Sequence, residues 1–164
     1  MYASSGFAAT ATFTPAAAAY SAGDVMDVAK ELVLTNSSGQ PFTGRGGDGG
    51  GGEYLITSSM LMVSETAVQA GETSYLLKLY NVTPPSAHAD NAAWDLPSGD
   101  RAAYLGSLSL GAPVDIGSTL VVETDDLRKQ ITVPSTGKIF AELVTASAFT
   151  ATATARKVTL HGVV

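Results

Sequence analysis

Short segments in which apolar and polar residues alternate recur along the whole chain, and turn residues separate them. In 73–82, Tyr75, Leu77 and Leu79 occupy every second position, and a period of two places alternate side chains on opposite faces of a strand. No segment longer than ten residues shows a clean helical stripe. We therefore predict an all-β fold, a β-sandwich or jelly roll of about nine short antiparallel strands. The predicted strands span 7–13, 25–35, 54–63, 73–82, 101–110, 114–124, 127–133, 138–146 and 153–163.

The N-terminal segment has an apolar pattern of its own. Phe7 and Phe13 are large apolar residues that share one face of an extended chain with Ala9 and Ala11, so the segment is either a strand or a clinging arm. We interpret 1–20 as an N-terminal arm and 21–164 as a single β-sandwich domain. Deleting residues 1–14 is then expected to leave a folded domain that no longer associates.

Two long loops interrupt the strand pattern. Residues 44–52 are almost entirely glycine, and ordering such a loop costs much conformational entropy. Residues 83–100 contain three prolines and the only tryptophan, Trp94, which is typical of a structured loop. Trp94, Leu96 and Tyr104 are expected to cluster there, either as a small satellite core or as an interface anchor.

The charge of the chain is low for a soluble protein. Charged residues make up 15% and the net charge is −6, whereas an ordinary soluble protein is about 25% charged. A surface with so little charge exposes apolar patches, and such patches usually mark partner surfaces. The basic residues form no clustered face, so we predict no direct nucleic-acid binding.

The sequence contains no complete motif for a catalytic, cofactor or metal site. The run 44–52 formally contains G-x-G-x-x-G, but a predicted strand follows it where the dinucleotide fingerprint needs a helix. Ser86, His88 and Asp90 are neighbours on one loop, whereas a triad is assembled from separate segments. His161 is the only other histidine, and the acidic loops lack calcium-loop spacing. We predict no enzyme activity, no cofactor and no metal.

The chain contains no cysteine, and its first basic residue is Lys30. It can therefore form no disulfide or thiolate site, and its N-terminal residues do not have the pattern of a secretory signal. No apolar run approaches the ~20 residues of a membrane-spanning helix. We expect a protein that is not exported by the general route and has no membrane partner.

Three stretches of the chain resemble sequences of a known class of proteins. They are Ser-Ala-Gly-Asp-Val-Met-Asp-Val-Ala at 21–29, Leu-Tyr-Asn-Val-Thr-Pro-Pro-Ser-Ala at 79–87, and Asp-Asn-Ala-Ala-Trp-Asp-Leu-Pro-Ser-Gly-Asp-Arg-Ala-Ala-Tyr-Leu-Gly at 90–106. They resemble tailed-bacteriophage structural proteins, and most of all the small head decoration, or cement, proteins. The resemblance spans residues 8–164 and is carried by local sequence and composition.

The resemblance implies a jelly-roll or sandwich domain, often a homotrimer, on the outside of the capsid where subunits of the major capsid protein meet. Such a protein is made in the bacterial cytoplasm and ends in the virion, where many weak contacts act together through avidity. The residues expected at the interface with the capsid or with other copies are Tyr2, Phe7, Phe13, Trp94, Leu96 and Tyr104.

Two other functions stay open. One is a receptor- or carbohydrate-binding module of a phage fibre, which an exposed aromatic patch near the Gly-rich loop would favour. The other is a tail or connector subunit, since β-sandwiches also serve there. An enzyme would need polar residues gathered in a cleft.

Overall fold

The computed structural model describes residues 6–42 and 51–164. The prediction of an all-β fold is confirmed, with 50% of the residues in strands and 2% in helix. The helical residues form a short 3-10 turn, η1 (Ser98–Asp100). The strands are β1 (Gly6–Phe13), β2 (Ala19–Tyr20), β3 (Lys30–Asn36), β4 (Gly52–Val63), β5 (Tyr75–Tyr80), β6 (Tyr104–Leu110), β7 (Val114–Asp115), β8 (Leu120–Thr124), β9 (Lys129–Val133), β10 (Ile139–Thr145), β11 (Phe149–Thr150) and β12 (Arg156–Val163).

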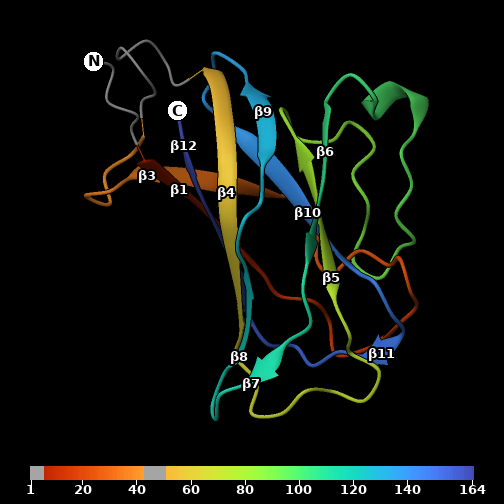
Figure 1. Cartoon of the computed structure of the whole chain (residues 1–164). Helices are drawn as coiled ribbons and strands as arrows, with labels where there is room; N and C mark the ends of the chain where they lie inside the picture. The colour runs from red at the N-terminus through yellow and green to blue at the C-terminus, as the bar shows by residue number, and fades with distance from the viewer. Residues whose placement is uncertain (1–5, 43–50) are drawn as a thin grey trace.

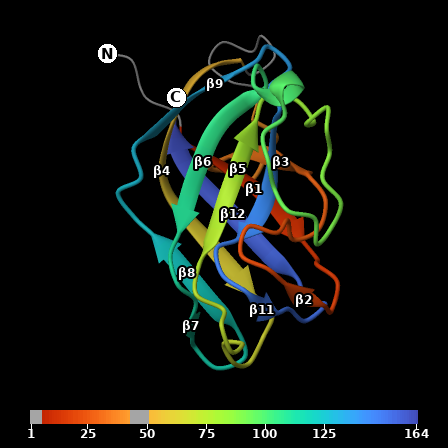
Figure 2. The ribbon, with the colours of Figure 1, turned by 90° about the vertical axis from the view of Figure 1, so that its right-hand side faces the viewer.

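Ten strands form one antiparallel sheet in the order β6-β5-β10-β3-β1-β12-β4-β8-β7, and β9 pairs with β4 beside β8. The sheet curls into a half-barrel, so that β4, β12 and β1 lie opposite β5 and β6 across the interior (Figure 1). The view at right angles shows β5 and β6 in front of β12 and β4 (Figure 2). A separate pair, β2 and β11, lies at one end of the molecule (Figure 2).

The core fills the inside of this curl, because alternate residues of each strand point inward. Leu61 and Val63 of β4 and Leu77 and Leu79 of β5 are fully buried. Aromatic clusters lie towards the two ends of the curl. Phe7, Phe42 and Tyr54 pack at one end with ring centroids 5.1–6.1 Å apart, and Tyr20, Tyr75 and Phe149 pack at the other.

β1 is an internal strand of the sheet, which corrects the interpretation of 1–20 as an arm. It pairs with β12 along its whole length and with β3 on its other side. Phe7 is 4% exposed and Phe13 is fully buried. Their inward side chains supply part of the apolar burial that stabilises this chain, so neither side chain is available to an interface.

Two predicted strands differ most from those observed, and the two-residue strands β2 and β11 were not predicted. The segment 25–35 is a strand only from Lys30, because Asp27 has a left-handed backbone (φ 74°) and its carboxylate accepts hydrogen bonds from the backbone N–H groups of Thr14 and Val28. The segment 114–124 is divided into β7 and β8. Gly117 makes that turn with φ 116°, and its N–H donates to the Asp115 carboxylate.

β4 is the longest strand in the described part of the chain, with 12 residues, and has two partners along one edge. Its first residues pair with β9 and its last residues pair with β8. Two different strands therefore lie along the same edge of β4. A bulge in β4 accompanies this change, because Thr57 is an extra residue between Ile56 and Ser58, which pair with the consecutive residues Gly162 and His161 of β12. Gly162 packs so closely that a Cβ atom there would lie 2.6 Å from Cε1 of Phe7.

Candidate interaction surfaces

The loop between β5 and β6, which contains Trp94, lies over the outer side of β5 and β10. It is the green loop at the right of Figure 1. Beneath it, Glu142 of β10 is fully buried. Its carboxylate accepts hydrogen bonds from Tyr80 Oη at 2.9 Å and Trp94 Nε1 at 3.1 Å, and it contacts His88 Nδ1 at 3.0 Å. A buried carboxylate needs such partners, so Glu142 fixes this loop to the sheet.

His88 lies between two carboxylates. Its Nδ1 contacts buried Glu142 and its Nε2 contacts Asp95 Oδ1 at 2.9 Å. Burial alone would lower the pKa of His88, but the hydrogen bonds and charges of Asp95 and Glu142 outweigh burial and raise the pKa above its ordinary value. The imidazole therefore carries positive charge more readily here than in water and holds the two acids together.

Trp94 on this loop and Tyr104 at the start of β6 form a half-buried aromatic surface. Their ring centroids are 5.9 Å apart, and Tyr104 also contacts Tyr80 at 5.5 Å. Lys78 Nζ lies 4.0 Å from the centroid of the Trp94 ring, a cation–π contact, and burial lowers the pKa of Lys78. The rings are held in place from behind while part of each stays exposed, as an interface anchor requires.

The neighbouring residues Ser86, His88 and Asp90 are directed to three different partners. The backbone N–H of Ser86 donates to Asp100, and His88 reaches Glu142. Asp90 accepts from Tyr20 Oη at 2.7 Å and from the backbone N–H of Asp27 at 2.6 Å. The Ser86 backbone and the side chains of His88 and Asp90 fasten the loop in three places, and the three residues form no serine–histidine–aspartate relay.

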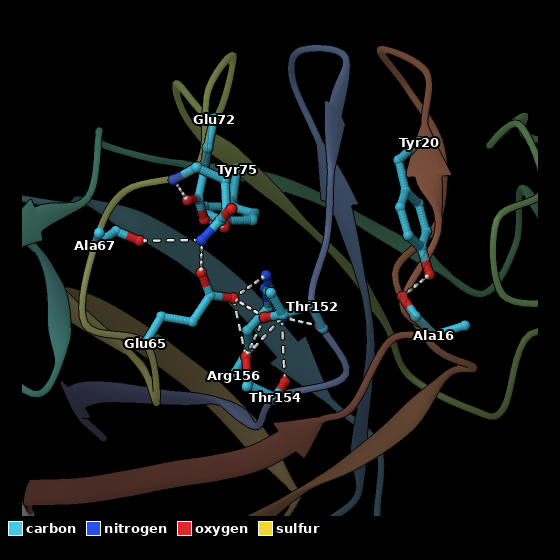
Figure 3. A network of polar contacts seen from close by, with 10 residues as sticks. Ala16, Tyr20, Glu65, Ala67, Glu72, Tyr75, Thr152, Thr154 and Arg156 are labelled. Atoms are coloured by element: carbon cyan, nitrogen blue, oxygen red, sulfur yellow. Dashed lines mark hydrogen bonds and ion pairs between the residues drawn. The ribbon is translucent and has the colours of Figure 1, made fainter.

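A second buried charge lies near β2 and β11 (Figure 3). Arg156 is fully buried, and its Nη2 lies 3.0 Å from Oε1 of Glu65. Thr152 and Thr154 also donate to this carboxylate. Burial alone would raise the pKa of Glu65, but these hydrogen bonds and the arginine outweigh it and lower the pKa. The cluster ties the β4–β5 and β11–β12 connections together.

The outer face of β8, β4, β12 and β1 forms another surface. The pairing register aligns Val121, Met62, Lys157 and Thr12 in one row across the strands, and directly opposed residues share a face of the sheet. Met62 is 42% exposed. At the sheet edge, Val114 and Ile116 are 61% and 67% exposed and line a hollow of about 340 Å³. This face combines apolar side chains with little charge.

The structure places the residues predicted for an interface in three different settings. Phe7 and Phe13 lie in the core, whereas Trp94, Leu96 and Tyr104 lie half-buried on or beside one loop. Tyr2 and residues 44–50 of the Gly-rich loop lie outside the described residues.

Sequence reasoning missed the polar partners of the aromatic loop and the apolar outer face of the sheet. Glu142 carries no signal in the sequence, because its role depends on side chains from three separate segments. Met60 and Met62, by contrast, are two residues apart in the predicted strand 54–63. That spacing puts them on one face, but only the curl decides which face is outside.

Within residues 6–42 and 51–164, no group of three or more His, Asp or Glu side chains could hold a metal ion. No helix in the same residues is long and apolar enough to span a membrane. No protein-family model and no curated protein matches the chain.

Proposed function

We propose that this protein is a structural subunit of a bacteriophage particle, a head decoration protein that binds the outside of the major capsid shell and does not act as an enzyme. We further propose that the curled sheet is a form of the sandwich or jelly-roll architecture to which the resemblance points. The sequence stretches at 21–29, 79–87 and 90–106 support the phage assignment.

The observation that carries the proposal is the aromatic surface around Trp94 and Tyr104. Tryptophan and tyrosine dominate interface hot spots because they bury a large area with few rotatable bonds. Glu142 and Lys78 hold the tryptophan from behind, so little side-chain freedom is lost on docking. Leu96 adds an apolar group beside it. In this proposal the loop is the contact with the shell.

The test is co-sedimentation of the purified protein with undecorated phage shells. The wild-type protein is expected to pellet with the shells. Leu96→Asp is expected to weaken binding by at least about tenfold, because it puts a charge into the contact, and it leaves the Glu142 hydrogen bonds in place. Val68→Asp is the matched control, since Val68 is 40% exposed on a different loop, and it should bind as the wild type does.

A wild-type protein that stays in the supernatant contradicts the decoration proposal. Equal binding by Leu96→Asp and the wild type contradicts the aromatic loop as the contact, and shell binding lost in Val68→Asp as well places the contact elsewhere. Pelleting with phage tails in place of heads identifies a tail or connector subunit.

A fibre-borne carbohydrate-binding module is the second candidate, because the same aromatic surface favours it. The Trp94 and Tyr104 rings are partly exposed, with Asp95 and Lys78 beside them, and aromatic faces with polar neighbours suit sugar rings. Binding on a glycan array that Tyr104→Ser removes, together with no binding to shells, would select this function over decoration.

A further inference from the structure

The outer face of β8, β4 and β12 carries its charges in an unusual arrangement. Paired residues form rows across the three strands. One row consists of Val121, Met62 and Lys157, and the neighbouring row on the same face consists of Glu123, Met60 and Thr159. The acid Glu123 and the base Lys157 therefore lie at diagonally opposite corners of this block of six residues, and Met60 and Met62 lie between them.

Glu123 and Lys157 are both exposed, and neither forms an ion pair or hydrogen bond with another side chain in the described part of the chain. Two strand spacings and one two-residue step separate them, which places their Cα atoms about 12 Å apart. At that separation the two side chains stand out from the sheet without pairing within one chain.

The midpoint between the two charges falls between Met60 and Met62 on the central strand, β4. One two-fold axis exchanges the positions of the two charges: it lies in the plane of this face, passes through the midpoint and is perpendicular to the line that joins Lys157 and Glu123. It brings Lys157 of one copy over Glu123 of the other, and the reverse pair forms at the same time, as an isologous interface requires.

We propose that a second copy of this chain docks on the outer face of β8, β4 and β12 about that axis, with Lys157 and Glu123 paired across the interface. The proposal goes beyond the decoration function and does not depend on it. It predicts a two-fold pair, whereas the resemblance implies a trimer.

The centre of such a contact is apolar. The axis runs close to Val121, Met62 and Met60, so each of these side chains packs near its own copy. Met62 is 42% exposed in the single chain, and burying apolar area is the main driving force for association. Methionine side chains are unbranched and adapt to an opposing surface. The two charge pairs at the flanks fix the register of the docking.

The test is the mass of the purified protein in solution, measured by sedimentation equilibrium over a range of concentrations. The wild-type protein is expected to form a dimer. Met62→Glu should weaken the dimer by at least about tenfold, because it buries two acids beside the axis. Val82→Glu is the matched control, since Val82 is 47% exposed outside this face, and it should dimerise as the wild type does.

Charge exchange tests the register. Lys157→Glu and Glu123→Lys should each weaken the dimer, because each puts like charges opposite one another, and the double variant should restore it. Circular dichroism and thermal unfolding of each variant identify any loss of fold, and the double variant retains the net charge of the wild type.

A wild-type protein that is monomeric at all concentrations overturns the proposal, and so does a dimer or trimer that Met62→Glu leaves intact. Single charge variants that weaken association without recovery in the double variant overturn the pairing of Lys157 with Glu123. Because the protein is measured alone, failure to bind phage shells leaves this result unaffected.

Discussion

At the scale of single residues, three buried or nearly buried ionisable groups organise the connections of this fold. Arg156 and Glu142 are fully buried, and the His88 side chain is 9% exposed. Each has at least one oppositely charged partner from another segment, because a charge removed from water without partners costs several kcal/mol, on the order of 5. These groups hold loops in place that would otherwise have few apolar contacts.

Replacing Arg156 with Met is expected to destabilise the fold by about 3–5 kcal/mol, because Glu65 is then buried without its cation. Chemical denaturation followed by circular dichroism measures the change in the free energy of unfolding. Arg128→Met is the control. The Arg128 side chain is 80% exposed, and its loss should change stability by less than about 0.5 kcal/mol.

Adding Glu65→Leu to Arg156→Met should recover much of the loss, since neither buried charge then remains. If Arg156→Met is as stable as the wild type, the buried pair does not hold the two connections together.

His88 gives the fold a dependence on pH. The pKa of His88 is raised in the folded protein, whereas in the unfolded chain it is about 6.5. The stability from charged His88 is therefore fully present below about pH 6.5 and is lost as the pH rises through the folded value. The free energy of unfolding of wild type minus that of His88→Gln should decrease from pH 5 to pH 9.

A difference that stays constant over that range would show that His88 gains nothing from its charge beside Glu142 and Asp95. The fluorescence of Trp94 reports on the same loop, because its indole N–H donates to Glu142. Its emission should shift with the same pH dependence in the wild type and not in His88→Gln.

At the scale of elements, β1 determines whether the N-terminal segment can be removed. Because β1 lies between β12 and β3, deleting residues 1–14 removes an internal strand and part of the core. We expect the truncated protein to be unfolded by circular dichroism and calorimetry. A truncated protein that folds and fails only to associate would restore the arm interpretation.

A matched pair of substitutions tests the register of β1 without a deletion. Ala9 is fully buried, whereas Ala8 is half-exposed on the outer face. Ala9→Thr should cost about 1–3 kcal/mol because it overpacks the core, whereas Ala8→Thr should change stability by less than about 0.5 kcal/mol. Equal effects would contradict the observed register.

At the scale of the whole molecule, the two proposed contact surfaces lie on opposite sides of the half-barrel. The aromatic loop covers β5 and β10, and the outer face of β4 and β12 lies across the core from them (Figures 1 and 2). One surface can therefore contact a shell while the other contacts a second copy. Two linked contacts of moderate strength give an avidity that either contact alone does not.

The sequence by itself determined the class of fold and the approximate place of most strands. The alternation of apolar residues in 54–63 and 73–82 follows from the two-residue period of a strand, and both segments form strands, β4 and β5. In β5 the outer residues Lys78 and Tyr80 are buried as well. The grouping of Trp94 with Tyr104 was also predictable, because the proline-rich loop brings them near each other. Local pattern is sufficient for features that depend on neighbours in the chain.

The tertiary structure alone decided which surface each strand exposes and which distant side chains meet. Phe7 and Phe13 have the pattern of either an arm or a strand, and only pairing with β12 and β3 places them in the core. Glu142 has buried partners from three separate segments, and the Lys157–Glu123 diagonal exists only once β12, β4 and β8 are in register. Pairing register depends on the summed burial of the whole sheet, which no local window of sequence contains.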